Sequence, residues 1–484
     1  MTRGPNIVLI TTDQQRYDTV GPRAPDFLRT PHLDHMAREG ITYSSAYAQC
    51  PMCVPSRVSI MTGRTVAGHG MAHNGHSSEV VDRETSLPSM LRQAGYQTAA
   101  IGKMHFTPER ARHGFDEMLL PADYYTEMTR RGHDVQPMRH GLGQNELYPG
   151  MATVPESLTL TSWTAERCVD YIRERRDPTV PFFLWCSFSK PHPPLDPPEP
   201  YYSMYLNSPI PEPVFGDWSE DERCPEAFRR AREKWSLDLI PPEVIRAARA
   251  AYYGLVTHID YAIGRVFAAL QDLRMFDDTL LVFTSDHGEY LGDHHTGAKT
   301  FFHEASAHVP FIVRLPKSWD DRRHGTTVAD PVTHADIMPT LLAAAGQPAP
   351  GQCDGQDLFA LARGELDSPR RYVDGVGRVP DATYHAITDG RWKYIHYPEG
   401  DTEQLFDVEN DPDERTDLSG SSEHEKRRAD LRQELIDLLE RRGSEWVRDG
   451  RLVSQEPFGD TTRDRRNESW PGYHTERHDV DVRH

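Results

Sequence analysis

The chain has 484 residues, of which 37% are hydrophobic and 26% charged, and its formal net charge is −20. Such a chain can bury a large core and form two domains, which excludes a fibre or a disordered chain. The negative charge argues against nucleic acid as a partner, and an anionic substrate would need a locally positive pocket. No run approaches the ~20 apolar residues of a membrane span, and the N-terminal apolar run is too short for a signal peptide. We therefore expect a cytoplasmic protein with no membrane partner.

Short apolar, β-branched runs predict buried parallel strands at 6–12, 98–101, 181–188, 279–285 and 308–313. Apolar residues at helical spacing predict helices at 85–94 and 242–273. Strands that alternate with helices predict an α/β sheet wound by crossover connections. The segment 196–242 is rich in Pro, Glu and Trp and has no clear periodicity. We interpret it as an insertion over the surface, either a lid or an oligomer contact.

The pattern changes after about residue 370. The pair Asp389–Gly390 lies between the apolar segments 385–387 and 392–397, which is a strong signal for a β-hairpin. A further strand around Leu405 would extend the same antiparallel sheet.

A helix is predicted after this sheet. Ser422 and Glu425 fit a capping box at its start, and its apolar stripe consists of Leu431, Leu435, Leu438 and Leu439. We therefore predict an N-terminal α/β catalytic domain over 1–370 and a smaller C-terminal α+β domain, with a polar tail, over 371–484.

Polar residues follow four of the predicted strands. They are Asp13 and Gln14, Lys103 and His105, Lys190 and His192, and Asp286 and His287. In wound parallel sheets, ligands bind outside the carboxyl ends of the strands. Four such endings, with acids and bases among them, predict one site assembled from distant parts of the chain.

The acids in this set indicate a metal. Asp13 and Asp286 would supply hard oxygen ligands suited to Ca²⁺, Mg²⁺ or Mn²⁺. His287 adds a nitrogen, which shifts the preference toward Mn²⁺, and Gln14 could coordinate through its side-chain oxygen. The alternative is that each Asp caps the helix after its strand. The pair of acids, beside a histidine and opposite basic residues, favours a divalent metal ion.

The segment from Cys50 to Arg57 reads Cys-Pro-Met-Cys-Val-Pro-Ser-Arg. As C-x-x-C it could be a redox or zinc motif, but no second C-x-x-C exists to complete a zinc ribbon. Pro55 fits the first turn of a helix, which would place Cys53 at a helix N-terminus that favours anions. An unmodified structural cysteine remains the other interpretation.

Read as C-x-P-S-R, followed by Thr62-Gly63-Arg64, the segment resembles the signature of type I sulfatases. The likeness extends to the G-K-x-H motif at 102–105, the K-P-H motif at 190–192, the S-D-H-G motif at 285–288 and the later Lys299. The resemblance implies the alkaline phosphatase superfamily fold, in which a large mixed, mostly parallel sheet is flanked by helices. A smaller C-terminal domain with an antiparallel sheet accompanies it.

Two positions depart from the commonest pattern of that family. Many sulfatases have Asp where this chain has Gln14, and Asn where it has His287. The Asp-Gln with Asp-His combination resembles the subgroup that contains choline sulfatases, phosphonate monoester hydrolases and some arylsulfatases. Asn74 lies where that subgroup has a substrate-contacting Asn.

The resemblance also implies a mechanism. Cys53 would be oxidised to formylglycine by a transiently bound formylglycine-generating enzyme, and a divalent metal ion, Ca²⁺ or Mn²⁺, would activate the hydrated aldehyde to attack sulfur. His105 would be the base that releases sulfate, and His192 or Lys299 would protonate the leaving oxygen. Lys103, Lys299 and Arg57 would offset the charge of the transferring group.

The implied reaction is hydrolysis of a small sulfate monoester to an alcohol and inorganic sulfate, by a protein that could be a homo-oligomer. Two alternatives remain open. One is a phosphonate monoester or phosphodiester hydrolase that uses the same site, because both transferring groups are tetrahedral oxyanions. The other is a thiol-redox or metal-binding protein in which Cys50 and Cys53 form a disulfide.

Overall fold

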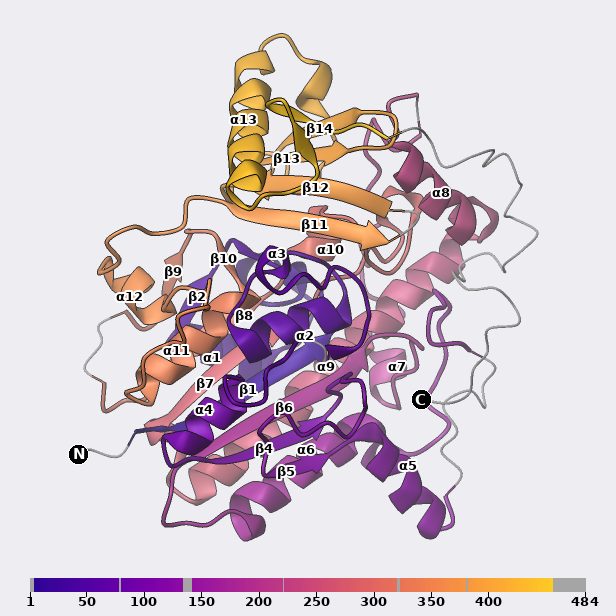
Figure 1. Cartoon of the computed structure of the whole chain (residues 1–484). Coiled ribbons are helices and arrows are strands. Elements are labelled where there is room, and N and C mark those ends of the chain that lie inside the picture. Colours follow the sequence, from indigo (N-terminus) through magenta and orange to yellow (C-terminus); the bar gives the residue numbers. More distant parts are fainter. Residues whose placement is uncertain are drawn as a thin grey trace.

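The computed structural model describes residues 4–77, 80–133, 142–220, 222–319, 323–379 and 382–455. Its centre is an eight-stranded sheet with helices on both faces (Figure 1). Across the sheet the order is β5 (Glu117–Leu119), β4 (Gln97–Gly102), β6 (Phe182–Pro191), β1 (Asn6–Asp13), β7 (Thr279–Ser285), β8 (Phe311–Arg314), β2 (Ile41–Tyr43) and β9 (Thr326–Val328).

The sheet is mixed and mostly parallel, as predicted. Neighbouring strands are parallel from β5 through to β7. Strand β8 is antiparallel to both β7 and β2, whereas β2 and β9 are parallel. The parallel orientation expected for 308–313 is therefore wrong, although the strand exists, because a buried apolar run has the same pattern in either direction.

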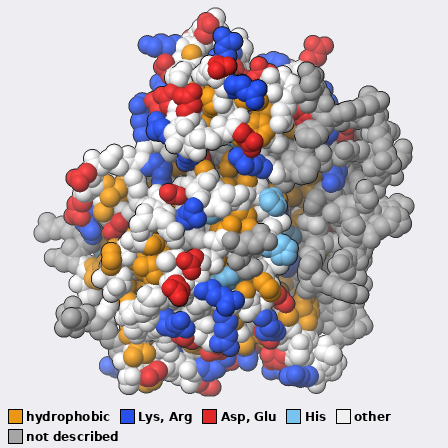
Figure 2. Space-filling model, viewed as in Figure 1, with side chains coloured by type: hydrophobic (Ala, Val, Ile, Leu, Met, Phe, Trp, Pro, Cys, Tyr) orange, Lys and Arg blue, Asp and Glu red, His pale blue; other side chains and the backbone are white. Residues whose placement is uncertain are grey.

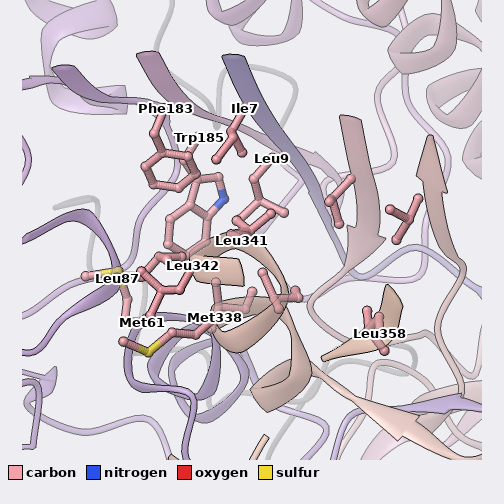
Figure 3. Packing of buried hydrophobic residues seen from close by; sticks show 14 of the residues in the cluster. Ile7, Leu9, Met61, Leu87, Phe183, Trp185, Met338, Leu341, Leu342 and Leu358 are labelled. Atoms are coloured by element: carbon pink, nitrogen blue, oxygen red, sulfur yellow. The ribbon is translucent and has the colours of Figure 1, made fainter. Parts of the chain in front are cut away.

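Alternate side chains of the central strands enter two separate cores. Ile7 and Leu9 pack with helices α2 (Cys53–Thr62), α4 (Leu87–Gln93) and α11 (Ile337–Ala344) on one face (Figure 3). Val8 and Ile10 pack on the other face with α1 (Pro31–Glu39), α6 (Leu160–Asp170) and α9 (Pro242–Asp272). Because both faces of β1 are buried, its sequence is continuously apolar rather than alternating.

The C-terminal part forms the predicted antiparallel sheet. Its four strands, in spatial order, are β11 (Val373–Val379), β12 (Ala382–Thr388), β13 (Trp392–Tyr397) and β14 (Thr402–Asp407). Helix α13 (Glu425–Arg441) covers one face of this sheet (Figure 1). Leu431, Leu435 and Leu439 are buried there, whereas Leu438 is partly exposed.

The capping box predicted from Ser422 and Glu425 does not form. The N-cap of α13 is His424, which makes no side-chain cap, and Glu425 is already the first residue of the helix. The two predicted partners therefore lie out of the capping register. The predicted C-terminal tail falls on residues 456–484, outside those described.

The segment 196–242 is not the surface insertion that its sequence suggested. It contains α7 (Tyr201–Met204) and α8 (Glu226–Trp235), and Trp218 and Phe228 are fully buried. These two rings share a core with Phe302 from the catalytic part and Phe406 from the C-terminal sheet. The segment is thus packed between the two parts of the chain, and the domain boundary after residue 370 remains a prediction.

A buried ion cluster joins the two parts as well. Lys393 on β13 has no exposed side-chain surface, and its Nζ lies 2.7 Å from Glu304 Oε1 and 2.8 Å from Glu414 Oε1. Glu304 begins α10 (Glu304–Ala307) and also lies 2.6 Å from His308 Nδ1. A charge this deeply buried is tolerated only when it is paired.

The remaining strands and α-helices of the described residues are β3 (Ala46–Tyr47), β10 (Val332–Thr333), β15 (Val447–Arg448), β16 (Arg451–Leu452), α3 (Val66–His69), α5 (Pro121–Arg130) and α12 (Leu358–Arg363). None of the helices within the described ranges combines the length and apolar character that a bilayer crossing requires.

A buried histidine of the C-terminal sheet predicts acid sensitivity. Burial, with smaller effects from His396 and Arg378, lowers the pKa of His385 to about 3. The unfolded chain takes up this proton at about pH 6.5. Stability from the neutral ring is therefore present above about pH 6.5 and is lost as the pH falls.

For this group we expect a loss of roughly 2–3 kcal/mol between about pH 6.5 and pH 4.5. Urea unfolding at several pH values, followed by far-ultraviolet circular dichroism, should give a shallower pH dependence for His385→Phe than for the wild type. The exposed His73→Phe serves as the matched control. Parallel curves for His385→Phe and wild type would contradict the assignment.

Candidate active site

The site lies where the carboxyl ends of the central strands meet the N-terminus of α2. Thr12 of β1 pairs with Ser285 of β7 in parallel register, so the residues that follow them, Asp13 and Asp286, emerge side by side. Both carboxylates have no exposed surface. Helix α2 begins at Cys53, which is 1% exposed, and thus delivers a third side chain to the same point.

Cys53 is in contact with three groups of the site. Its Sγ lies 3.3 Å from His287 Nε2, 3.8 Å from Asp13 Oδ1 and 4.0 Å from Lys299 Nζ. Burial and the charge of Asp13 oppose ionisation of the thiol, but Lys299, Lys103 and His287 outweigh them and hold the pKa of Cys53 well below its usual value. The surroundings of position 53 therefore favour negative charge.

Two cations neutralise the buried carboxylates. The guanidinium of Arg57 donates from Nε to Asp286 Oδ2 at 3.0 Å, and its Nη2 lies 3.5 Å from Asp13 Oδ2. Lys103 Nζ lies 2.7 Å from Asp13 Oδ2. Burial opposes the charge of Asp13, but nearby positive charge, that of Lys103 above all, outweighs it and keeps the pKa of Asp13 well below the usual range.

The second carboxyl behaves in the opposite way. Burial and the neighbouring charge of Asp13 raise the pKa of Asp286, despite His287 and Arg57 beside it. Two carboxylates in one dry pocket repel each other, so one pKa falls while the other rises. An additional positive charge at this point would favour both ionised forms.

The donor set fits a divalent cation. Ligand atoms of Asp13, Cys53, Asp286 and His287 all lie within 4.8 Å of one another. His287 Nδ1 lies 2.9 Å from the Gly288 carbonyl oxygen, so Nδ1 carries the proton and donates. Nε2 is then the ring atom that faces the carboxylates, 3.6 Å from Asp286 Oδ1 and 3.8 Å from Asp13 Oδ1. Burial opposes a charge on this ring, but Asp286 outweighs burial and raises the pKa of His287. A ring orientation fixed through the other nitrogen is typical of metal-binding histidines.

Gln14 borders this group. It adopts a left-handed backbone conformation, with φ 71°, and its N–H donates to Asp286 Oδ1 at 3.1 Å. Its side-chain Oε1 accepts from Lys299 Nζ at 2.7 Å, and its Nε2 donates to Glu289. The amide therefore lies at the edge of the carboxylate cluster and connects it to Lys299.

The other residues predicted from the sequence, His192, Asn74 and His105, lie around the carboxylate cluster and are not among its possible metal ligands. His192 donates its backbone N–H to the Asp13 carbonyl oxygen at 3.0 Å, and burial together with Lys299 and Lys103 keeps the pKa of its ring well below the usual value. The exposed Asn74 accepts from the Val54 N–H at 3.1 Å through Oδ1, so it lies at the first turn of α2. His105 is also exposed, and its side chain forms no hydrogen bond or ion pair with any described residue.

Two polar residues of the site were not singled out from the sequence. Ser187 on β6 accepts from Arg57 Nη1 at 2.9 Å and donates to the Lys103 carbonyl oxygen at 2.6 Å. Glu289 contacts Gln14 and is 1% exposed. A serine inside an otherwise apolar strand was the available signal for the first, and an acid two residues after His287 for the second. Lys190, by contrast, pairs with Asp196 in the following loop.

The face of the molecule seen in Figure 2 carries histidine, basic and acidic side chains. Histidine side chains gather near the middle of the face seen in Figure 1, and a group of Lys and Arg side chains lies below them (Figure 2). Acidic side chains lie beside these basic groups in the same view, so the face carries both signs of charge (Figure 2).

Fold and site together define a hydrolase of the alkaline phosphatase superfamily. The chain belongs to the sulfatase family, whose model matches residues 5–347, and it is a sulfuric ester hydrolase. A second family model, described as the C-terminal part of N-sulphoglucosamine sulphohydrolase, matches residues 292–441. The family assignment made from the Cys53–Arg57 motif is thus confirmed.

Individual proteins agree with this assignment. The chain is 36% identical over 476 residues to an arylsulfatase of Clostridium perfringens, covering 94% of this chain and 98% of that protein. It is 31% identical to a choline-sulfatase of Rhizobium meliloti, covering 87% and 83%. The solved structure of a phosphonate monoester hydrolase from Silicibacter pomeroyi shares the fold, with a TM-score of 0.77 at 24% identity over 94% of this chain and 100% of that one.

Arg57 should be required for the stability of the metal-free site. In Arg57→Met, two buried carboxylates lose their shared cation, and breaking a buried pair typically costs about 3–5 kcal/mol. Urea unfolding in the presence of a chelator should show a loss of this size. Arg110→Met, which removes a cation from the exposed pair with Asp123, should show no comparable loss. If the two variants were equally stable, the neutralising role of Arg57 would be excluded.

Proposed function

We propose that this protein hydrolyses a sulfate monoester of a small molecule, releasing the alcohol and inorganic sulfate, through a formylglycine made from Cys53. The observation that carries the proposal is the position of Cys53 Sγ, 3.3 Å from His287 Nε2 and 3.8 Å from Asp13 Oδ1 at the N-terminus of α2. The names of the relatives, arylsulfatase and choline-sulfatase, favour sulfate esters.

One divalent cation would be held by Asp13, Asp286 and His287, with Gln14 as a further oxygen ligand. When bound, such an ion lowers the pKa of a hydroxyl next to it and offsets the charge of a transferring oxyanion. Formylglycine would supply that hydroxyl at position 53 as a hydrated aldehyde. Oxygen donors and a single imidazole suit Ca²⁺ or Mn²⁺.

The chain's own residues would bind and orient the anionic group. Lys103 and Lys299 lie on two sides of the cluster, at 2.7 Å from Asp13 and 4.0 Å from Cys53. Arg57 pairs with both carboxylates, so its charge holds Asp13 and Asp286 in place and is not exposed to solvent. Preorganised cations of this kind stabilise the charge that develops on a transferring group.

The residues that would donate and accept protons in the reaction can also be assigned. We assign protonation of the leaving oxygen to Lys299, because burial with Lys299 and Lys103 disfavours the charged form of His192 by lowering its pKa. His192 would then accept a hydrogen bond. Asn74 would contact the substrate from the first turn of α2, and His105 would be the base that releases sulfate.

The modification of Cys53 would have to precede folding. The side chain is 1% exposed, so a formylglycine-generating enzyme could reach it only in the unfolded or nascent chain. We also propose that the protein is located in the cytoplasm. The structure leaves Cys50 and Cys53 as free thiols, which does not favour the alternative of a disulfide between them.

Replacing the nucleophile precursor tests the proposal. Cys53→Ala should abolish release of sulfate from an aryl sulfate, whereas Cys353→Ala, at a half-buried thiol away from the site, should retain it. Mass spectrometry of the active protein should show an aldehyde at position 53. Turnover by Cys53→Ala would refute the mechanism. Faster hydrolysis of an aryl phosphonate monoester than of the sulfate would instead favour the phosphonate hydrolase.

Metal removal should abolish activity reversibly. Dialysis against a chelator should stop sulfate release, and adding back Mn²⁺ or Ca²⁺ should restore it and raise the melting temperature. A ligand at a hundred times its dissociation constant stabilises the folded state by about 2.7 kcal/mol. Asp13→Asn and Asp286→Asn should lose this stabilisation. Full activity in the chelated protein would contradict the cation site.

A further inference from the structure

The side-chain amide of Gln14 lies between the ammonium group of Lys299 and the carboxylate of Glu289. Its Oε1 accepts from Lys299 Nζ at 2.7 Å, and its Nε2 donates to Glu289 Oε2. The residue is 1% exposed, so water does not compete for either contact. The two ends of an amide have similar shapes but opposite hydrogen-bonding roles.

The backbone of Gln14 is fixed independently of this amide. Its N–H donates to Asp286 Oδ1 at 3.1 Å, and its carbonyl oxygen accepts from the Tyr252 hydroxyl at 2.7 Å. Only the direction in which the amide faces is left to be decided. In one direction its oxygen faces Lys299; in the other, its NH₂ group faces an ammonium that has only donors.

The carboxylate of Glu289 selects which end of the Gln14 amide faces Lys299. Its Oε1 accepts from the Leu291 N–H at 2.8 Å, and its Oε2 accepts from Gln14. The carboxylate is 1% exposed and makes no hydrogen bond to Cys53, Asp13 or Asp286 within the described residues. The side chain of Glu289 therefore meets the site through its hydrogen bond with Gln14 and through its charge interaction with Lys299.

We propose that Glu289 is a positioning residue, which fixes the amide of Gln14 with its oxygen toward Lys299 and the cation site. The part that concerns the cation rests on the proposed function, whereas the part that concerns Lys299 does not. A glutamine ligand needs such a partner because only one of its two ends can bind a cation. A carboxylate ligand does not, since both of its ends are oxygen.

The first test needs no cation. In chelator-treated protein, Glu289→Gln lets the amide of Gln14 turn, so that Lys299 loses its acceptor. Lys299→Met should then shift the urea midpoint less in the Glu289→Gln background than in the wild type. Additive shifts would overturn the proposal, whether or not the protein binds a cation. Non-additive shifts that persist when Gln14 is replaced by Met would come from the charges of Glu289 and Lys299 alone and would also overturn it. Non-additive shifts that need Gln14, in a protein that binds no cation, would support the positioning role and refute the proposed cation site.

The second test exchanges the two side chains. Glu289→Gln should weaken Mn²⁺ binding by about 10- to 100-fold, as loss of a ligand's supporting contact typically does, measured by calorimetry on metal-stripped protein. The double variant Gln14→Glu/Glu289→Gln restores a donor-to-acceptor pair and leaves a carboxylate oxygen toward the site. Its affinity should return to within a few-fold of the wild type or exceed it.

A purely structural role gives a different pattern. If Glu289 only held the Leu291 N–H, the glutamine oxygen in Glu289→Gln would still accept that bond and Mn²⁺ binding would be unchanged. If it were simply intolerant of change, the double variant would bind as weakly as the single one. Either result would overturn the proposal. Glu365→Gln, an exposed change, is the control.

Discussion

The site depends on two carboxylates that lie side by side without solvent. Parallel pairing of β1 and β7 places Asp13 and Asp286 together, and both are fully buried. Such a pair would be unstable alone, because each charge has lost its hydration and repels the other. Arg57 and Lys103 supply the compensating charge at distances of 2.7 to 3.5 Å. Two buried cations thus offset two buried carboxylates, and Lys299, whose Nζ lies 4.0 Å from Cys53 Sγ, adds a further positive charge at the same point.

The helix N-terminus and the buried cations around it favour negative charge on the side chain at position 53. As the first residue of α2, Cys53 lies where unpaired backbone N–H groups favour negative charge. Arg57, one turn further on, ties the helix to Asp286, and Ser187 ties the same guanidinium to β6. The helix cannot move without breaking these buried bonds. The position of Cys53 is therefore set by the same contacts that neutralise the carboxylates, so the residues proposed for catalysis also stabilise the fold.

Local sequence predicted the parts of the structure that depend on short segments. The strand ends at Asp13 and Asp286 and the turn at Gly390 could be located because buried strands and hairpin turns have clear residue patterns. The direction of β8, the burial of Trp218 and the role of Glu289 could not be located in this way. Each is decided by partners elsewhere in the chain: β8 by β7 and β2, Trp218 by the Glu414 carbonyl oxygen, and Glu289 by Gln14. No single-sequence pattern records such partners.

The C-terminal sheet supports the site through a short chain of contacts. The backbone N–H groups of Gly288 and Glu289 donate to Ser306 and Ala305 at 2.7 and 2.8 Å, which attaches the loop after β7 to α10. A Cβ at position 288 would lie 2.1 Å from the Ala305 carbonyl oxygen, so only glycine permits this approach. Helix α10 is held in turn through Glu304, which is paired with the buried Lys393 of β13. Without the C-terminal sheet Glu304 would lose its ion pair with Lys393 and keep only the one with His308, and the loop that carries His287 would lose part of its support. The antiparallel sheet thus supports the candidate site, although none of its described residues makes a hydrogen bond with Cys53.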